Sequence, residues 1–225
     1  MVLRACWNAG SGLLFRLLSK NKRAGMAGVD YPAVWKGRPG FLDCDVNLHL
    51  NNASYFLSME LARWHFTAST GMLWQAVKHR HLYFAGSQAI RYRHAIPLFH
   101  AYEIHTRMVY WDDQWTYLLH HFQCPTTGKL YAEGFCRVMV KAGGKRVLFA
   151  ELVGEVNDGE VPSRPSEMPA VVKGFLEYDA ASRISMENAA DRAKLNIEAS
   201  PPPPTPEKLS ARIWAEMRRS MNRPW

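Results

Sequence analysis

The 225-residue sequence lacks any apolar run of the roughly 18 residues that a membrane-crossing helix needs. Its longest early apolar stretch, GLLFRLL, is interrupted by Arg16. The hydrophobic fraction is nevertheless 48% and the aromatic fraction 12%, which is enough for a sizeable core. We therefore expect a globular body that is soluble or only peripherally attached to a membrane.

Cysteine is scarce, and its four positions show neither metal-ligand spacing nor the density of a secreted disulfide scaffold: Cys6, Cys44, Cys124 and Cys136. We interpret them as free thiols in a reducing compartment. The histidine pairs at 79/81 and 120/121 lack a carboxylate or thiolate at ligand spacing, so we predict no metal site. The G-x-S-x-G pattern is also absent, which argues against a serine hydrolase of that type.

Acidic residues are absent from positions 1–29, which carry a net charge of +5. Residues 200–225 carry +3, whereas residues 30–199 hold 18 basic and 18 acidic residues. The overall charge of +8 therefore belongs to the ends of the chain. A nucleic-acid-binding domain concentrates positive charge on the fold itself, so we do not expect a nucleic-acid partner.

The two ends have distinct compositions. Residues 1–36 begin with spaced basic residues among leucines and small residues, a pattern typical of organelle transit peptides. We predict a mitochondrial location, with a cytoplasmic protein carrying a disordered or membrane-grazing basic arm as the alternative. Residues 200–225 combine the proline-rich linker PPPPTP with a basic amphipathic helix. That helix either docks onto a protein partner or an anionic membrane surface, or folds back on its own domain.

The middle of the chain predicts one long helix followed by antiparallel strands. Tyr55, Met59, Ala62 and Phe66 recur at helical spacing after an N-cap at Asn51 or Asn52, and Gly71 is a plausible stop. A short extended segment, RPGFLDCD, precedes this helix. Period-two patterns predict strands near 81–93, 99–111, 114–124, 130–141 and 146–154, and weaker helical patterns follow at 166–178 and 185–197. The residues of one face of 130–141 are small and apolar, which suits packing against the helix. We predict an α+β fold with a sheet curved around that helix.

The stretch DCDVNLHLNN, residues 43–52, places Asp45 close to the start of the predicted helix. The first amides of a helix have no internal acceptor and can polarise a carbonyl group, while a nearby carboxylate can attack that carbonyl or deprotonate water. This combination is suited to acyl transfer or hydrolysis. The structural alternative is that the aspartates and asparagines only satisfy turn and helix-start amides.

The same stretch resembles the hotdog-fold thioesterases of the 4-hydroxybenzoyl-CoA type. Their signature D-x3-H-x-N-N-x2-Y-x4-E-x2-R is matched by Asp45, His49, Asn51, Asn52, Tyr55, Glu60 and Arg63. The segments GFLDCDVNLHLNNASYF and YEIHTRMVYWDDQWTYL look most like the family of thioesterase superfamily member six. The resemblance implies a hotdog domain over residues 37–180, one long central helix wrapped by a curved antiparallel sheet, with residues 181–199 as a helical extension.

The resemblance also implies roles for residues. Asp45 would be the nucleophile or general base, the Asn52 amide would polarise the thioester carbonyl, and Asn47 and His49 would orient water or the carboxylate. Glu60 and Arg63 would form a structural ion pair. The implied substrate is an acyl-CoA or acyl-carrier thioester, with no further cofactor, and the implied assembly is a homodimer or higher oligomer.

Basic residues on hairpin ends are candidates for binding the CoA phosphates. The strongest are Lys141, Lys145 and Arg146 in the loop KAGGKR, and further candidates are Arg91, Arg93 and Lys129. Lysines and arginines in such places are commonly just solvated. The competing hypothesis is a catalytically silent hotdog protein that serves as a structural subunit of a larger, for example mitochondrial, assembly.

Overall fold

The computed structural model describes residues 2–18, 26–157, 160–199, 212–213 and 215. The chain divides into two compact units, residues 1–175 and 176–225, and each is described by itself. Most of the predicted C-terminal linker and helix lies outside the described residues. None of the described helices is long and apolar enough to cross a membrane.

The long predicted helix is α2 (Asn52–Thr70), and both of its predicted ends are confirmed. The Asn51 side chain accepts a hydrogen bond from the Ser54 amide at 2.9 Å, which satisfies one of the free amides of the first turn. Gly71 ends the helix with φ of 93°, a left-handed conformation that glycine adopts without steric cost. A second helix, α3 (Met72–His79), follows directly.

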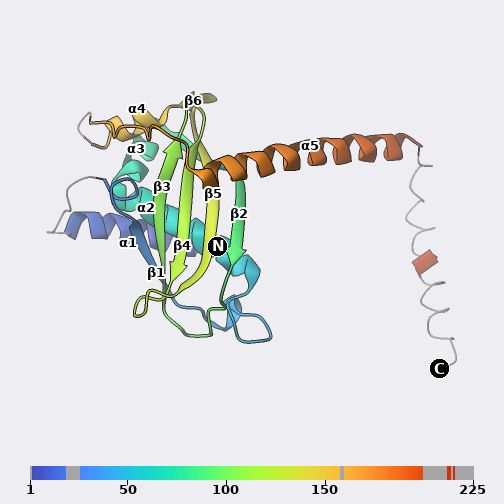
Figure 1. Ribbon diagram of the computed structural model, residues 1–225, viewed down its shortest axis with the longest axis horizontal. Helices are drawn as coiled ribbons and strands as arrows, with labels where there is room; N and C mark the ends of the chain where they lie inside the picture. Colours follow the sequence, from blue (N-terminus) through green and yellow to red (C-terminus); the bar gives the residue numbers. More distant parts are fainter. Residues whose placement is uncertain (1, 19–25, 158–159, 200–211, 214, 216–225) are drawn as a thin grey trace. The chain divides into compact units, whose positions relative to one another are not determined.

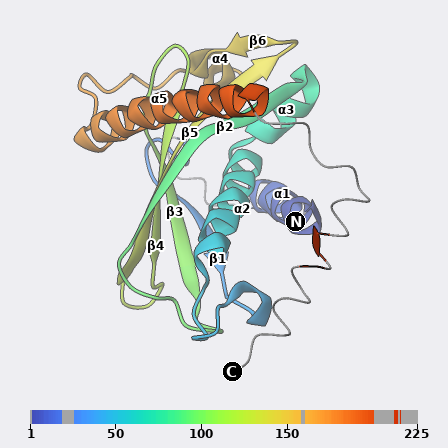
Figure 2. The same cartoon turned by 90° about the vertical axis from the view of Figure 1, so that its right-hand side faces the viewer.

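An antiparallel sheet curves around one side of α2, and α1 lies on the other side (Figures 1 and 2). Its strand order is β1-β3-β4-β5-β2, with the short β6 paired to β5. The strands are β1 (Ala33–Gly37), β2 (His81–Tyr92), β3 (Tyr102–Trp111), β4 (Thr116–Gln123), β5 (Leu130–Ala142) and β6 (Lys145–Val147). The strands predicted near 81–93, 99–111, 114–124 and 130–141 are confirmed as β2 to β5. The sheet wrapped around a helix is the hotdog arrangement.

Two local predictions were wrong. The predicted strand at 146–154 ends at Val147, and α4 (Phe149–Gly154) follows. Phe149, Leu152 and Val153 are buried at helical spacing. A helix therefore turns all three side chains inward, whereas a strand would point Leu152 and Val153 to opposite faces. The segment expected to be extended before α2 contains the 3₁₀ turn η1 (Phe41–Asp43), because the Asp43 carboxylate accepts a hydrogen bond from the Gly40 amide at 3.0 Å.

The small face of β5 sets the distance between the sheet and α2. A Cβ atom on Gly134 would lie 2.5 Å from the Met59 Sδ, so the Met59 side chain occupies the space that glycine leaves open. Ala132 and Cys136 on the same face are buried in the core cluster that contains Met59 and Tyr55. The prediction that this face of β5 lies against the helix is therefore confirmed.

The two helical segments predicted after residue 166 form one helix, α5 (Ala170–Ala199), because the sequence between them contains no proline or glycine. Its first turns belong to the first unit. Val172 and Phe175 are buried there, and the Phe175 ring lies 4.6 Å from the Phe135 ring on β5. The remainder of α5 belongs to the second unit.

The N-terminal segment contains a folded helix, α1 (Val2–Leu18), that packs against α2. The Asn8 side chain is buried and its Oδ1 accepts a hydrogen bond from Trp35 Nε1 at 2.5 Å. Arg4 pairs with Asp43 at 2.7 Å, and Arg16 donates to the Thr70 carbonyl at 2.5 Å. Residues 2–18 are thus part of the folded unit, which the sequence did not predict.

Replacing Asn8 with alanine should test this docking. The change leaves the Trp35 indole N–H without its acceptor, so we expect a loss of about 1–2 kcal/mol in the free energy of unfolding, measured by urea denaturation. Cys6→Ala, an exposed position on the same helix, is the matched control and should change stability by less than about 0.5 kcal/mol. Equal stabilities for the two variants would show that α1 does not dock in this way.

Candidate functional site

The loop between Asp45 and His49 is closed by hydrogen bonds to the predicted catalytic carboxylate. Asp45 Oδ1 accepts from the backbone amides of Asn47 at 2.9 Å and His49 at 3.2 Å. The Asp45 amide in turn donates to the His49 carbonyl at 2.8 Å. The structure therefore brings together three of the predicted site residues, with the carboxylate exposed and fixed in direction.

Leu48 in this loop has φ of 58°, a left-handed conformation that a leucine rarely adopts. Such strain costs on the order of 1–3 kcal/mol and persists only where the surroundings enforce it. Two backbone hydrogen bonds do so: Leu48 N–H donates to the Asp45 carbonyl at 3.0 Å, and Leu98 N–H donates to the Leu48 carbonyl at 2.8 Å. The 93–100 segment thus holds the Asp45 loop in place.

The loop leads directly into the start of α2. The Asn51 amide donates to the Asp43 carbonyl at 3.0 Å, and Asn51 caps the helix. Asn52 is the first helical residue, so its amide has no acceptor within the helix. The Asn52 carbonyl accepts from the Tyr92 hydroxyl at 3.2 Å, which ties the helix start to the end of β2. The Asp45 carboxylate therefore lies on the loop that immediately precedes α2, and the free Asn52 amide lies at the N-terminus of that helix.

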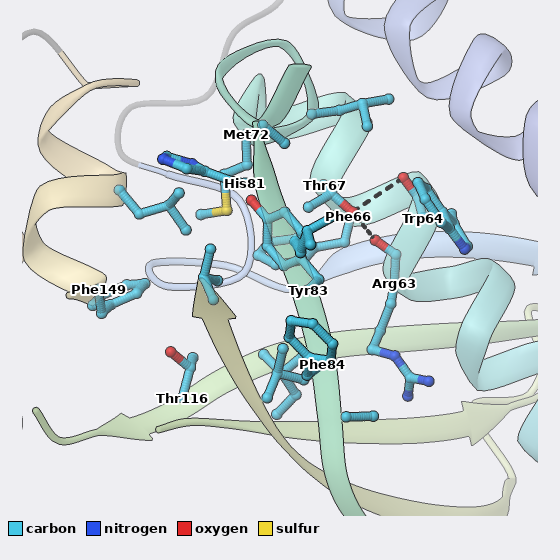
Figure 3. Close-up of a pocket in the computed structure, with 18 of the residues that line it drawn as sticks. Arg63, Trp64, Phe66, Thr67, Met72, His81, Tyr83, Phe84, Thr116 and Phe149 are labelled. Carbon is cyan, nitrogen blue, oxygen red and sulfur yellow. Dashed lines mark hydrogen bonds between the residues drawn. The ribbon is translucent and has the colours of Figure 1, made fainter. Parts of the chain in front are cut away.

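A cavity of about 870 Å³ lies farther along α2, between its second half, α3, α4, the start of β2 and the inner face of the sheet (Figure 3). Its walls are mainly apolar and include Phe66, Met72, Tyr83 and Phe149. None of the predicted catalytic residues lines it. Sequence reasoning missed this cavity; the available signal was the aromatic pair Tyr83-Phe84 on an edge strand.

An ion pair sits at the rim of the cavity. Arg63 contacts Glu60 on α2 and donates to Gln88 Oε1 on β2 at 3.0 Å. The Arg63 side chain is only 11% exposed, so the buried guanidinium depends on these partners. The predicted Glu60–Arg63 pair is confirmed, and it links the helix to the edge strand.

The predicted phosphate-binding residues divide between the two ends of the sheet. Arg91, Arg93 and Lys129 lie at the Tyr92 end, which the Asp45 loop adjoins. Lys141, Lys145 and Arg146 lie at the opposite end. Lys141 pairs with Leu82 at the start of β2 and with Arg146 on β6, and Lys145 pairs with Ala142. The Asp45 loop adjoins the far end of β2, at Tyr92. At about 3.3 Å per residue, the length of β2 separates the two ends by roughly 35 Å. Within one chain, Lys141, Lys145 and Arg146 therefore do not form a single site with Asp45.

Two titratable side chains elsewhere in the domain, His120 and Cys124, are buried. His120 Nδ1 bonds to the Thr106 hydroxyl at 2.9 Å, and burial holds the pKa of His120 well below its usual range. Hydrogen bonds to Thr127 and His100 lower the pKa of Cys124 to about 5, but its side chain is enclosed. In the described part of the chain, no group of three His, Cys, Asp or Glu residues could hold a metal ion.

The model of the thioesterase-like superfamily matches residues 39–176, which include α2, the Asp45 loop and five of the six strands. The match covers more than half of the chain, so the chain belongs to this superfamily.

Among curated relatives, the chain is 40% identical over 81 residues to Protein THEM6 of Drosophila melanogaster, covering 36% of this chain and 42% of that protein. It is 32% identical over 110 residues to Protein THEM6 of Danio rerio, covering 49% and 54%. The chain thus spans about half the length of these relatives.

Solved structures support the fold. The probable thioesterase YbaW of Escherichia coli matches with a TM-score of 0.50 and 18% identity, over 55% of this chain and 94% of that one. The protein SAV2348 of Staphylococcus aureus, solved in complex with CoA, matches with a TM-score of 0.50 and 13% identity, over 64% and 100%. At these identities the matches show the hotdog fold alone.

The loop geometry predicts different effects for two changes at Asp45. Asp45→Ala removes the acceptor for the Asn47 and His49 amides, so we expect a loss of about 0.5–2 kcal/mol in the free energy of unfolding. Asp45→Asn keeps a side-chain oxygen and should stay within about 0.5 kcal/mol of the wild type. Urea denaturation measures both. An Asp45→Ala variant as stable as the wild type would contradict the capping role.

Proposed function

We propose that this protein hydrolyses an acyl-CoA thioester with Asp45 as nucleophile or general base. The observation that carries the proposal is the Asp45 carboxylate, fixed by two loop amides beside the N-terminus of α2, in a chain of the thioesterase-like superfamily. A fixed carboxylate loses little orientational freedom when it acts, and a helix N-terminus favours negative charge.

The chemistry follows from these two groups. The Asn52 amide donates a hydrogen bond to the thioester carbonyl oxygen and stabilises the negative charge that develops there. Asp45 either attacks the carbonyl carbon, giving an acyl-enzyme that water then hydrolyses, or takes a proton from the attacking water. In both routes the C–S bond breaks, the thiolate leaves and is protonated, and the acid is released. Asn47 and His49 orient the water or the carboxylate.

A second protomer would unite the separated parts of the site. β2 is a 12-residue edge strand, and Leu82 and Phe84 on it are exposed. A long apolar edge of this kind invites pairing with another strand. If two copies pair their β2 strands antiparallel about a two-fold axis, the His81 end of one strand lies beside the Tyr92 end of the other.

This pairing has a direct consequence for catalysis. The Asp45 loop adjoins the Tyr92 end, whereas the apolar cavity, Lys141, Lys145 and Arg146 adjoin the His81 end. In the homodimer, the Asp45 loop of one protomer therefore faces the cavity and the basic hairpin of its partner. The cavity would hold the acyl group, and the hairpin is placed to meet the CoA phosphates.

The first test is release of free thiol from a panel of short-chain, long-chain and aromatic acyl-CoAs. Asp45→Asn should lower kcat by at least about 100-fold, because it removes the base or nucleophile but keeps the loop closed. Asp43→Asn is the matched control: it changes a carboxylate of the same loop that binds Arg4, and it should retain activity. Unchanged turnover in Asp45→Asn would remove Asp45 from the mechanism. If the folded wild type hydrolyses none of these acyl-CoAs, the result would favour the alternative that the protein is a catalytically silent structural subunit.

A second test asks whether one site uses two chains. Asp45→Asn disables the loop, and Leu73→Trp fills the cavity. Neither homodimer should hydrolyse the substrate. A heterodimer purified through two different tags should regain about half of the wild-type rate, because one of its two sites combines an intact loop with an intact cavity. If the loop and cavity of one chain formed the site, each chain would carry a defect and the heterodimer would be inactive.

A further inference from the structure

The outward face of α1 is apolar, although the helix is docked. Leu3, Leu14, Leu17, Leu18 and Trp7 fall within one arc of about 100° on a helix with 3.6 residues per turn. All five are exposed, Leu3 at 85%, Leu17 at 79% and Trp7 at 76%. A surface helix of a globular domain normally shows the opposite pattern, with its apolar face inward.

The inward face of α1 explains this inversion. Asn8 and Gly12 are the buried positions, and Asn8 accepts the Trp35 hydrogen bond. A Cβ on Gly12 would lie 2.7 Å from the Ala68 Cβ, so the helix approaches α2 closely through its small residues. The polar and small face therefore makes the intramolecular contact, and the leucines and Trp7 are left for something outside the chain.

The charge near this arc is positive on balance, with three cations against two carboxylates. Leu3 and Trp7 line a shallow surface pocket together with Arg4, Lys36 and Arg38, where the acidic residue is Asp43, paired with Arg4. Lys36 itself pairs with Glu103 at 3.6 Å. In the sequence, Lys20, Lys22 and Arg23 follow the helix, and positions 1–29 contain no acid. The occupant of the arc should therefore combine apolar and negatively charged groups.

We propose that α1 docks the protein onto an anionic lipid bilayer surface through Leu3, Trp7, Leu14, Leu17 and Leu18. A helix lying in the interface places leucine and tryptophan among the acyl chains and basic groups at the phosphates. A second copy of this chain fits less well, because pairing two α1 helices would bring two basic segments together. The proposal does not depend on the catalytic activity.

Co-sedimentation of the full chain with vesicles tests this docking. The protein should sediment with vesicles of phosphatidylcholine and phosphatidylglycerol, and much less with phosphatidylcholine alone. The triple variant Leu3→Gln, Leu14→Gln, Leu17→Gln should bind the anionic vesicles at least about tenfold more weakly. Because these side chains point away from α2, circular dichroism and the thermal midpoint should match the wild type.

The matched control carries the same number of changes in the C-terminal basic segment, Leu209→Gln, Ile213→Gln and Met217→Gln, and should bind as the wild type does. The proposal is overturned if the wild type does not bind anionic vesicles, or if the control variant loses vesicle binding while the α1 variant keeps it. It is also overturned if the α1 variant loses self-association in sedimentation velocity but keeps its vesicle binding, since the arc would then be an interface between copies.

Discussion

Close packing of α2 against the small face of β5 is the contact on which the rest of the structure depends. Gly134 leaves space for Met59, and Ala132 and Cys136 on the same face join the core cluster that contains Met59 and Tyr55. This fixes the two ends of α2 relative to the sheet. At one end the helix start meets the Asp45 loop, and at the other the helix, α3 and the sheet enclose a cavity.

In the proposed mechanism, the two ends of α2 have different tasks. The start of the helix carries the fixed carboxylate and the free amide to which the proposed mechanism assigns bond breaking. The far end offers apolar space with the Glu60–Arg63 ion pair among its lining residues, and basic side chains on the adjoining hairpin. In the proposed homodimer, a two-fold axis between the β2 edge strands would bring the two ends together.

The N-terminal helix shows that burial of apolar groups is not the only reason for a helix to dock. α1 is held by one indole hydrogen bond, an ion pair, and an arginine at the carbonyl end of α2, with glycine at the closest approach. Its leucines remain exposed. The charge of this segment therefore has a structural role, since Arg4 and Arg16 both bind the body of the domain.

The sequence by itself determined the long helix, its caps, the four central strands and the candidate Asp45 loop, because these follow from local patterns and from capping chemistry. It did not determine that 149–154 turns helical or that residues 2–18 dock, since both depend on which apolar or polar partners the folded sheet presents. It placed Asp45 and Lys141 in one predicted site, yet only the register of β2 and β5 decided that they lie at opposite ends of the sheet. The distance between two residues on a sheet depends on strand order and on the pairing register, and neither can be read from hydrophobic periodicity or composition.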